Sequence, residues 1–208
     1  MSSLAPGLLL IVVSLTIPPA RADLLFVGSQ AGECCFEVDL HQVSSTDVKV
    51  TVTLTSGATY FVDTGSGQHP GFAFNLKGDP GVSISNLSSP WNSSDVHLGT
   101  VTTGGHGLGK FDYFIDNPGP GSSAHNSGPL SFDVTLASGI SLADFIANSD
   151  GYYFVADIAD ASGDTGLSGI SAKPISDAPE PMSACFLLGI LGFGVMTSLR
   201  RKLARDRK

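Results

Sequence analysis

Apolar and polar positions alternate in short segments through the middle of the chain. The clearest segment spans residues 47–54, DVKVTVTL, in which Val or Leu occupies every second position. A period of two predicts a β-strand with one face buried and the other in water. Seven further segments have this pattern or a shorter apolar form of it, at residues 35–40, 59–62, 72–76, 96–101, 110–115, 130–136 and 152–158.

Turn residues separate these segments, which is typical of an all-β domain. A single sheet of eight strands would leave a wide apolar face open to water, so we predict two sheets packed face to face as a sandwich. A jelly-roll order of strands is compatible with this pattern. One short connecting helix is expected at Ser141, with Asp144 as its capping partner. Phe145 and Ile146 should then face the core.

Residues 1–22 have the organisation of a signal peptide. An apolar run over residues 7–17 is followed by two prolines and then by Ala20-Arg21-Ala22, a small-x-small cleavage site. The run is shorter than the roughly 20 residues that span a bilayer. We therefore expect signal peptidase to cleave after Ala22 and to leave Asp23 as the first residue.

A second apolar segment, at residues 182–199, has no charged residue and would form a helix of roughly 27 Å at ~1.5 Å per residue. This length predicts a transmembrane helix. Residues 200–208 follow it and begin with Arg200, Arg201 and Lys202, a basic cluster of the kind retained on the cytoplasmic side. The preceding domain should therefore face outward.

Charge is divided unevenly between these parts. Residues 23–181 contain 4 Lys or Arg against 18 Asp or Glu, whereas residues 200–208 contain 6 against 1. An acidic exported domain repels nucleic acid and attracts cations, so nucleic acid is not an expected partner. We place the β-sandwich at residues 23–170 and a polar linker at residues 171–178.

The tripeptide Pro179-Glu180-Pro181 stands directly before the apolar span and its basic cluster. In this order the three parts, over residues 179–208, resemble the PEP-CTERM sorting signal. The resemblance implies a protein exported by a Gram-negative bacterium that makes exopolysaccharide, and cleavage near the tripeptide by an exosortase-type membrane protease. It also implies transit through the inner membrane to the cell envelope, the surface or the extracellular matrix. Because proline cannot continue a membrane helix, the tripeptide should stay extended at the outer surface.

These parts predict a non-catalytic protein of the cell surface or the exopolysaccharide matrix, without a cofactor. The alternative is a carbohydrate-binding or Ca²⁺-assisted adhesion module. Trp91 lies in a loop and is the candidate for stacking on a sugar ring. Asp157, Asp160 and Asp164 are the candidate Ca²⁺ ligands, because carboxylates in a short loop suit this ion. Solvated carboxylates in an acidic turn explain the same spacing.

An aspartic-type peptidase is a less favoured alternative. Asp63-Thr64-Gly65 follows an apolar strand, as in such enzymes, and a second Asp-Thr-Gly occurs at residues 164–166. The chain is too short for two pepsin-like lobes, and both copies are ordinary turn sequences. We therefore do not expect an enzyme.

Three cysteines are present, and Cys185 falls within the apolar span. The adjacent Cys34 and Cys35 would meet an oxidising compartment after export. A disulfide between these neighbours, burial as small apolar residues and pairing between molecules all stay open.

Overall fold

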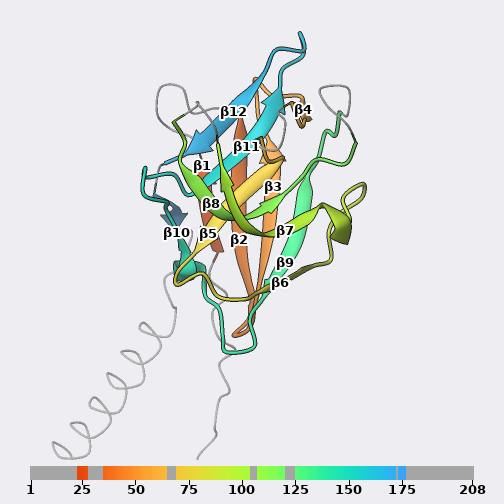
Figure 1. Cartoon of the computed structure of the whole chain (residues 1–208). Coiled ribbons are helices and arrows are strands. Elements are labelled where there is room, and N and C mark those ends of the chain that lie inside the picture. The colour runs from red at the N-terminus through yellow and green to blue at the C-terminus, as the bar shows by residue number, and fades with distance from the viewer. Residues whose placement is uncertain are drawn as a thin grey trace, which may run out of the picture.

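Two antiparallel sheets, stacked one behind the other, make up the folded domain (Figure 1). The computed structural model describes residues 23–27, 35–64, 69–103, 107–119, 125–171 and 173–176. The predicted all-β class and the pairing of two sheets are thereby confirmed. The predicted signal peptide, its cleavage residues Ala20 and Ala22, and the whole sorting segment of residues 179–208 lie outside the described residues.

The first sheet has six strands in the order β13-β1-β2-β3-β9-β6. Three strands that are consecutive in the sequence, β1 to β3, are neighbours in it, so this part is a meander. Their cross-strand partners include Phe26 opposite Val38 and Val38 opposite Val52. The strands are β1 (Asp23–Val27), β2 (Phe36–Ser44), β3 (Asp47–Leu54), β6 (Ser83–Ser85), β9 (Leu130–Thr135) and β13 (Ile175–Ser176).

The second sheet has seven strands. Five follow the order β12-β11-β5-β8-β7, while β4 pairs with β11 and β10 pairs with β5. The strands are β4 (Tyr60–Phe61), β5 (Phe72–Leu76), β7 (Val96–Thr102), β8 (Lys110–Ile115), β10 (Phe145–Ile146), β11 (Phe154–Ala159) and β12 (Thr165–Ile170).

The main core lies between the two sheets and is rich in aromatic rings. Phe132 of β9 meets Phe72 and Phe74 of β5 across the sandwich, with ring centroids 6.0 and 5.9 Å apart. Phe26 of β1 meets Phe154 of β11 edge to face at 4.8 Å. Rings from both sheets thus interlock, which fixes how one sheet sits on the other.

A second, smaller buried cluster consists of Ala73, Val101, Leu108, Phe111 and Val155. In β5 and β11, Ala73 and Val155 alternate with residues of the main core, so they point to the opposite side of the seven-stranded sheet. All residues of these two strands are buried. The outer side of this sheet is therefore partly covered, unlike a strand with one wet face.

Several strands were not predicted by the sequence pattern, namely β1, β6, β10, β12 and β13. Most are short, and β12 contains two glycines, so none has a strong period of two. One of them corrects the predicted linker: β13 lies within residues 171–178 and pairs with β1. Backbone pairing with an edge strand requires no hydrophobic pattern, which explains the error.

The predicted helix at Ser141 is a single 3₁₀ turn over Leu142–Asp144. Its capping is as expected, because Oδ2 of Asp144 accepts hydrogen bonds from the Ser141 backbone and hydroxyl, both at 2.8 Å. Phe145 is buried as predicted. Ile146 is not, since it is 37% exposed; β10 is extended, so its two successive side chains point to opposite faces.

Candidate functional site

Asp157 is a buried carboxylate in the middle of β11, with none of its surface exposed. Its Oδ2 accepts hydrogen bonds from the backbone nitrogen of Thr64 at 2.8 Å and from the Thr64 hydroxyl at 2.7 Å. Nδ1 of His69 lies 3.6 Å from the same oxygen. Within the described part of the chain, Oδ1 of Asp157 has no hydrogen-bond partner. The residue therefore ties the segment after β4 to β11 with one oxygen only.

Burial raises the pKa of Asp157 above its ordinary value, because a low-dielectric surrounding disfavours the charged form. The hydrogen bonds from Thr64 and the proximity of His69 oppose this shift, and the negative charge of Asp63 reinforces it. A carboxylate with a perturbed pKa is a common mark of a functional site, although structural networks produce it too.

The other two predicted Ca²⁺ ligands lie elsewhere, in the exposed turn between β11 and β12. Oδ1 of Asp160 accepts hydrogen bonds from the Ser162 backbone at 2.8 Å, the Ser162 hydroxyl at 2.6 Å and the Asp164 backbone at 3.1 Å. The hydroxyl bond is the main reason why the pKa of Asp160 is lowered. Asp160 is thus part of the turn's own hydrogen bonding, as in other Asx turns.

Asp157 and Asp160 consequently occupy different environments, one buried against Thr64 and one in a solvated turn. No group of three or more His, Cys, Asp or Glu side chains in the described ranges is arranged to hold a metal ion.

The two Asp-Thr-Gly copies make different contacts. Thr64 of the first copy contacts Asp157, whereas Asp164 of the second closes the turn onto Asp160.

Trp91 is 4% exposed, so the prediction that it offers an open ring for sugar stacking is wrong. Its ring meets Phe61 edge to face, with centroids 5.6 Å apart and planes at 87°. The backbone nitrogen of Trp91 also donates to the carbonyl of Ser88 at 3.0 Å. The loop folds inward because a large ring gains more by burial against Phe61 than by exposure.

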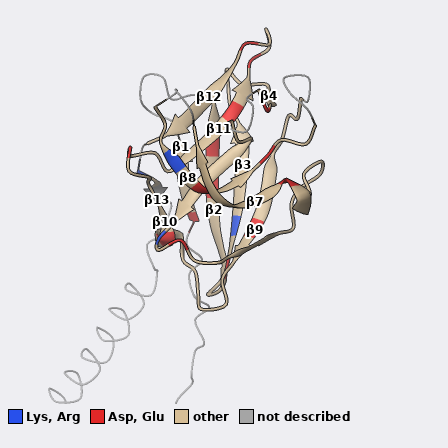
Figure 2. Cartoon of the chain, in the orientation of Figure 1, with Lys and Arg blue, Asp and Glu red and all other residues tan. Residues whose placement is uncertain are grey.

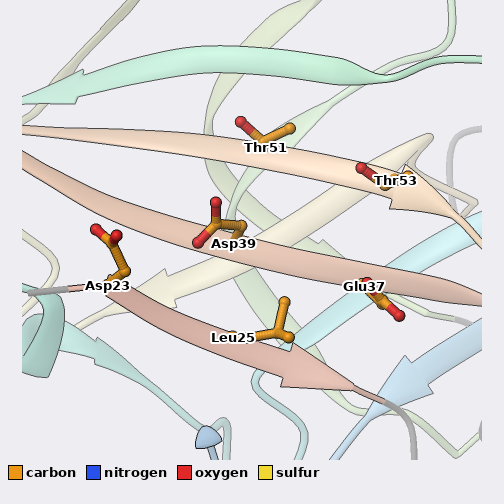
Figure 3. Close-up of a pocket in the computed structure, with 6 residues that line it drawn as sticks. All are labelled: Asp23, Leu25, Glu37, Asp39, Thr51 and Thr53. Carbon is orange, nitrogen blue, oxygen red and sulfur yellow. The ribbon is translucent and has the colours of Figure 1, made fainter. Parts of the chain in front are cut away.

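The outer face of the six-stranded sheet carries a shallow cavity of about 370 Å³ (Figure 3). It lies over β1, β2 and β3. Asp39 of β2 stands between Leu25 on one neighbouring strand and Thr51 on the other. We call this the β1–β3 cavity. Its lining residues are Asp23, Leu25, Glu37, Asp39, Thr51 and Thr53.

Charges in the β1–β3 cavity are mostly negative. Partial burial raises the pKa of Asp39, the negative charge of Asp23 adds to the shift, and His41 opposes it. His41 itself forms an ion pair with Asp23 across the two strands. Carboxylates and hydroxyls in this array are hydrogen-bond acceptors for a polyhydroxylated or cationic ligand. The sequence pattern had marked Thr51 and Thr53 only as the wet side of a strand, and it had not predicted β1, which carries Asp23 and Leu25.

Two further cavities, of about 400 and 610 Å³, lie on the seven-stranded sheet and share Lys110 and Ser149. We call them together the Lys110 groove. The smaller cavity is lined by β5, β7, β8 and the segment that follows β10, and the larger one continues along β7 towards Asp150. Such volumes fall within the range of ligand-binding cavities. No motif in the sequence pointed to this groove.

Acidic side chains are spread over strands and turns of both sheets, with few basic ones between them (Figure 2). The described residues include four lysines, Lys49, Lys77, Lys110 and Lys173, and no arginine. In the Lys110 groove, one of these lysines lies close to the carboxylates of Asp112 and Asp150.

Cys35 is disulfide-bonded and 8% exposed. It packs against Gly57, where a Cβ atom would lie only 2.8 Å from the Cys35 sulfur. Of the alternatives left open by the sequence, burial as a free thiol is therefore wrong for Cys35. Cys34 and Cys185 lie outside the described residues.

Comparisons with models of protein families, with curated proteins and with solved structures gave no match. Among the residues that the structure describes, no helix is long and apolar enough to cross a membrane.

Proposed function

We propose that this chain is a non-catalytic exported protein of the cell surface or exopolysaccharide matrix, released from the inner membrane by processing at its PEP-CTERM-like signal. The observation that supports this most directly is that the first and last described strands, β1 (Asp23–Val27) and β13 (Ile175–Ser176), are neighbours in one sheet.

These two strands pair, with Leu24 opposite Ser176 and Leu25 opposite Ile175. The two ends of the described domain are therefore held next to each other. Cleavage at the two proposed sites would remove none of the described strands. A domain organised in this way can be separated from a transit anchor without loss of its core.

The test is the mass of the product in a host that has an exosortase. We expect a mature protein that begins at Asp23, lacks residues 182–208 and accumulates outside the inner membrane. Replacement of Pro179, Glu180 and Pro181 by Ala should leave an uncleaved, membrane-retained form, because Ala lets the helix extend into the tripeptide. A matched Pro174→Ala variant should be processed normally. A wild-type product that still ends at Lys208 would contradict the proposal.

Glycan binding is a second candidate function, favoured by the two polar concave surfaces, the β1–β3 cavity and the Lys110 groove. Both have hydroxyl and carboxylate groups that suit sugar hydroxyls. Co-sedimentation of the protein with the host's exopolysaccharide, with and without Ca²⁺, tests this function. Ca²⁺-dependent retention would favour the adhesion variant, and no retention in either buffer would contradict both.

A further inference from the structure

The Lys110 groove has a rigid floor. Asn75, in β5, is 6% exposed. At this point its side chain, and not the β5 backbone, forms the hydrogen bonds to the backbone of β8. Its amide donates to the carbonyl of Lys110 at 3.2 Å, and its side-chain oxygen accepts from the backbone nitrogen of Asp112 at 2.7 Å. Because the backbone on both sides of Phe111 is held in this way, the side chains of Lys110 and Asp112 start from fixed positions.

The opposite wall is braced by a second asparagine. The Asn148 amide donates to the carbonyl of Leu108 at 2.7 Å, and its oxygen accepts from the backbone nitrogens of Asp150 and Tyr152, each at 3.0 Å. Both asparagines are thus occupied in holding the backbone. A preorganised site of this kind loses less conformational entropy when a ligand binds.

The polar groups that remain for a ligand are mixed in charge. Among the described residues the Lys110 ammonium has no ion-pair partner. Asp112 accepts a hydrogen bond at 3.1 Å from Thr100 on one oxygen, and its second oxygen has no hydrogen-bond partner in the same ranges. Thr102 stands directly opposite Lys110 on β7. The single Lys110 ammonium therefore offers three N–H donors, and the carboxylate and hydroxyl groups beside it are acceptors.

An apolar contact completes this set. Ile146, which is 37% exposed, stands opposite Asn75 on β10 and lines the smaller cavity. A sugar ring presents hydroxyls at its rim and C–H groups on its faces, so a wall of this composition matches both kinds of surface.

Charge decides among the classes of glycan. Lys110 is outnumbered by Asp112 and Asp150 in the groove, and the surrounding domain is acidic. Repeated carboxylates of a polyuronate would therefore be repelled, while the Lys110 ammonium disfavours a polycation at the centre of the groove. Neutral vicinal hydroxyls can accept from the ammonium and donate to the Asp112 carboxylate without either penalty.

We propose that the Lys110 groove binds a neutral polysaccharide, with Lys110 and Asp112 on adjoining hydroxyls of one sugar and Ile146 against its ring. This inference rests on glycan binding as the second candidate function and names its site and ligand class. It does not depend on how the tail is processed.

The experiment is affinity electrophoresis of the full chain, in mild detergent, through gels that contain laminarin, galactomannan, polygalacturonate or chitosan. We expect retardation by at least one of the neutral polymers, laminarin or galactomannan, and weaker retardation by polygalacturonate. The acidic domain attracts chitosan as a polycation wherever the groove lies, so chitosan is judged by the change between wild type and variants. Lys110→Gln and Asp112→Asn should each weaken the neutral interaction about tenfold, the usual effect of losing a charge-assisted hydrogen bond. Unchanged melting temperatures would show that these substitutions leave the fold intact.

Lys49→Gln and Asp39→Asn are the matched controls, since they remove the same charges from the outer face of the six-stranded sheet. If these controls weaken binding and the groove variants do not, the Lys110 site is wrong while glycan binding survives. Stronger retardation by polygalacturonate than by the neutral polymers would overturn the ligand class, as would a loss of chitosan retardation in Asp112→Asn larger than its loss of neutral-polymer retardation. No retardation by either neutral polymer would overturn the inference, and the mass experiment on the tail would still stand on its own.

Discussion

The outer faces of the two sheets differ although both sheets contribute to one core. On the six-stranded sheet, β3 alternates buried and solvent-accessible residues, and its outward residues are Asp, Lys and Thr. On the seven-stranded sheet, β5 and β11 are buried throughout. The second buried cluster covers part of that outer face. The buried polar residues Asn75 and Asp157 point to the same face, because they alternate with core residues along β5 and β11.

This difference shows what a buried outer position demands of a polar side chain. On the open face, the pKa of Asp39 is raised by partial burial and by the charge of Asp23, and no hydrogen bond holds its side chain among the described residues. Asn75 and Asp157 on the covered face each replace or extend backbone pairing with short hydrogen bonds. Polar groups in covered regions are mostly hydrogen-bonded, with Oδ1 of Asp157 an exception among the described residues, whereas those on an open face are satisfied by solvent.

The largest expected effect comes from the second buried cluster. Phe111→Ala should lower the free energy of unfolding by about 3–5 kcal/mol, because Phe111 is fully buried and its removal leaves a cavity. Thr51→Ala, an outward position of the open face, should change it by less than about 1 kcal/mol. Urea denaturation of both variants measures the difference. Equal losses would mean that the two outer faces are not energetically distinct.

Next in size is the loss of the asparagine that bridges β5 and β8. Asn75→Ala leaves the Lys110 carbonyl and the Asp112 backbone nitrogen without their partner, which should cost about 2–4 kcal/mol. Thr100→Ala removes only one exposed hydroxyl bond and serves as the control. Hydrogen exchange at the Asp112 amide should accelerate in the Asn75 variant alone. Unchanged exchange there would contradict the bracing role.

A smaller effect should appear as a pH dependence of stability. The folded-state pKa values of Asp157 and Asp39 are raised, so the stability associated with their protonated forms is present below their ordinary value of 3.8. It is lost as the pH rises through the raised pKa. The melting temperature of Asp157→Asn minus that of the wild type should therefore increase as the pH rises. The same difference for Asp39→Asn should increase less. A pH-independent difference for Asp157→Asn would contradict the raised pKa.

The smallest effect, of opposite sign, is expected in the turn at the end of β11. Asp160 has a lowered pKa, so its contribution is present above 3.8 and is lost as the pH falls through the lowered value. Asp160→Asn should melt slightly below the wild type at neutral pH and approach it in acid. Melting curves across this range provide the measurement. A widening gap towards low pH would show that the turn bonds do not favour the charged form.

The alternation of apolar residues was enough to locate the best-defined strands. The bounds predicted for β3, β5 and β8 agree with the structure, as does the capping of the turn after Ser141. These features depend on neighbours close in the sequence, through side-chain alternation or a bond over three residues. The acidic character of the domain also follows from the sequence alone.

Tertiary structure decided which of these strands met and what their remaining side chains contact. Thr64 and Asp157 are 93 positions apart, and no local pattern pairs them. The burial of Trp91 against Phe61 and the docking of β13 on β1 are equally non-local. The Lys110 groove, too, exists only because β5, β7, β8 and the segment after β10 converge. A period of two tells which face of a strand avoids water, but the partner that covers a face or lines a groove is chosen by packing between distant segments.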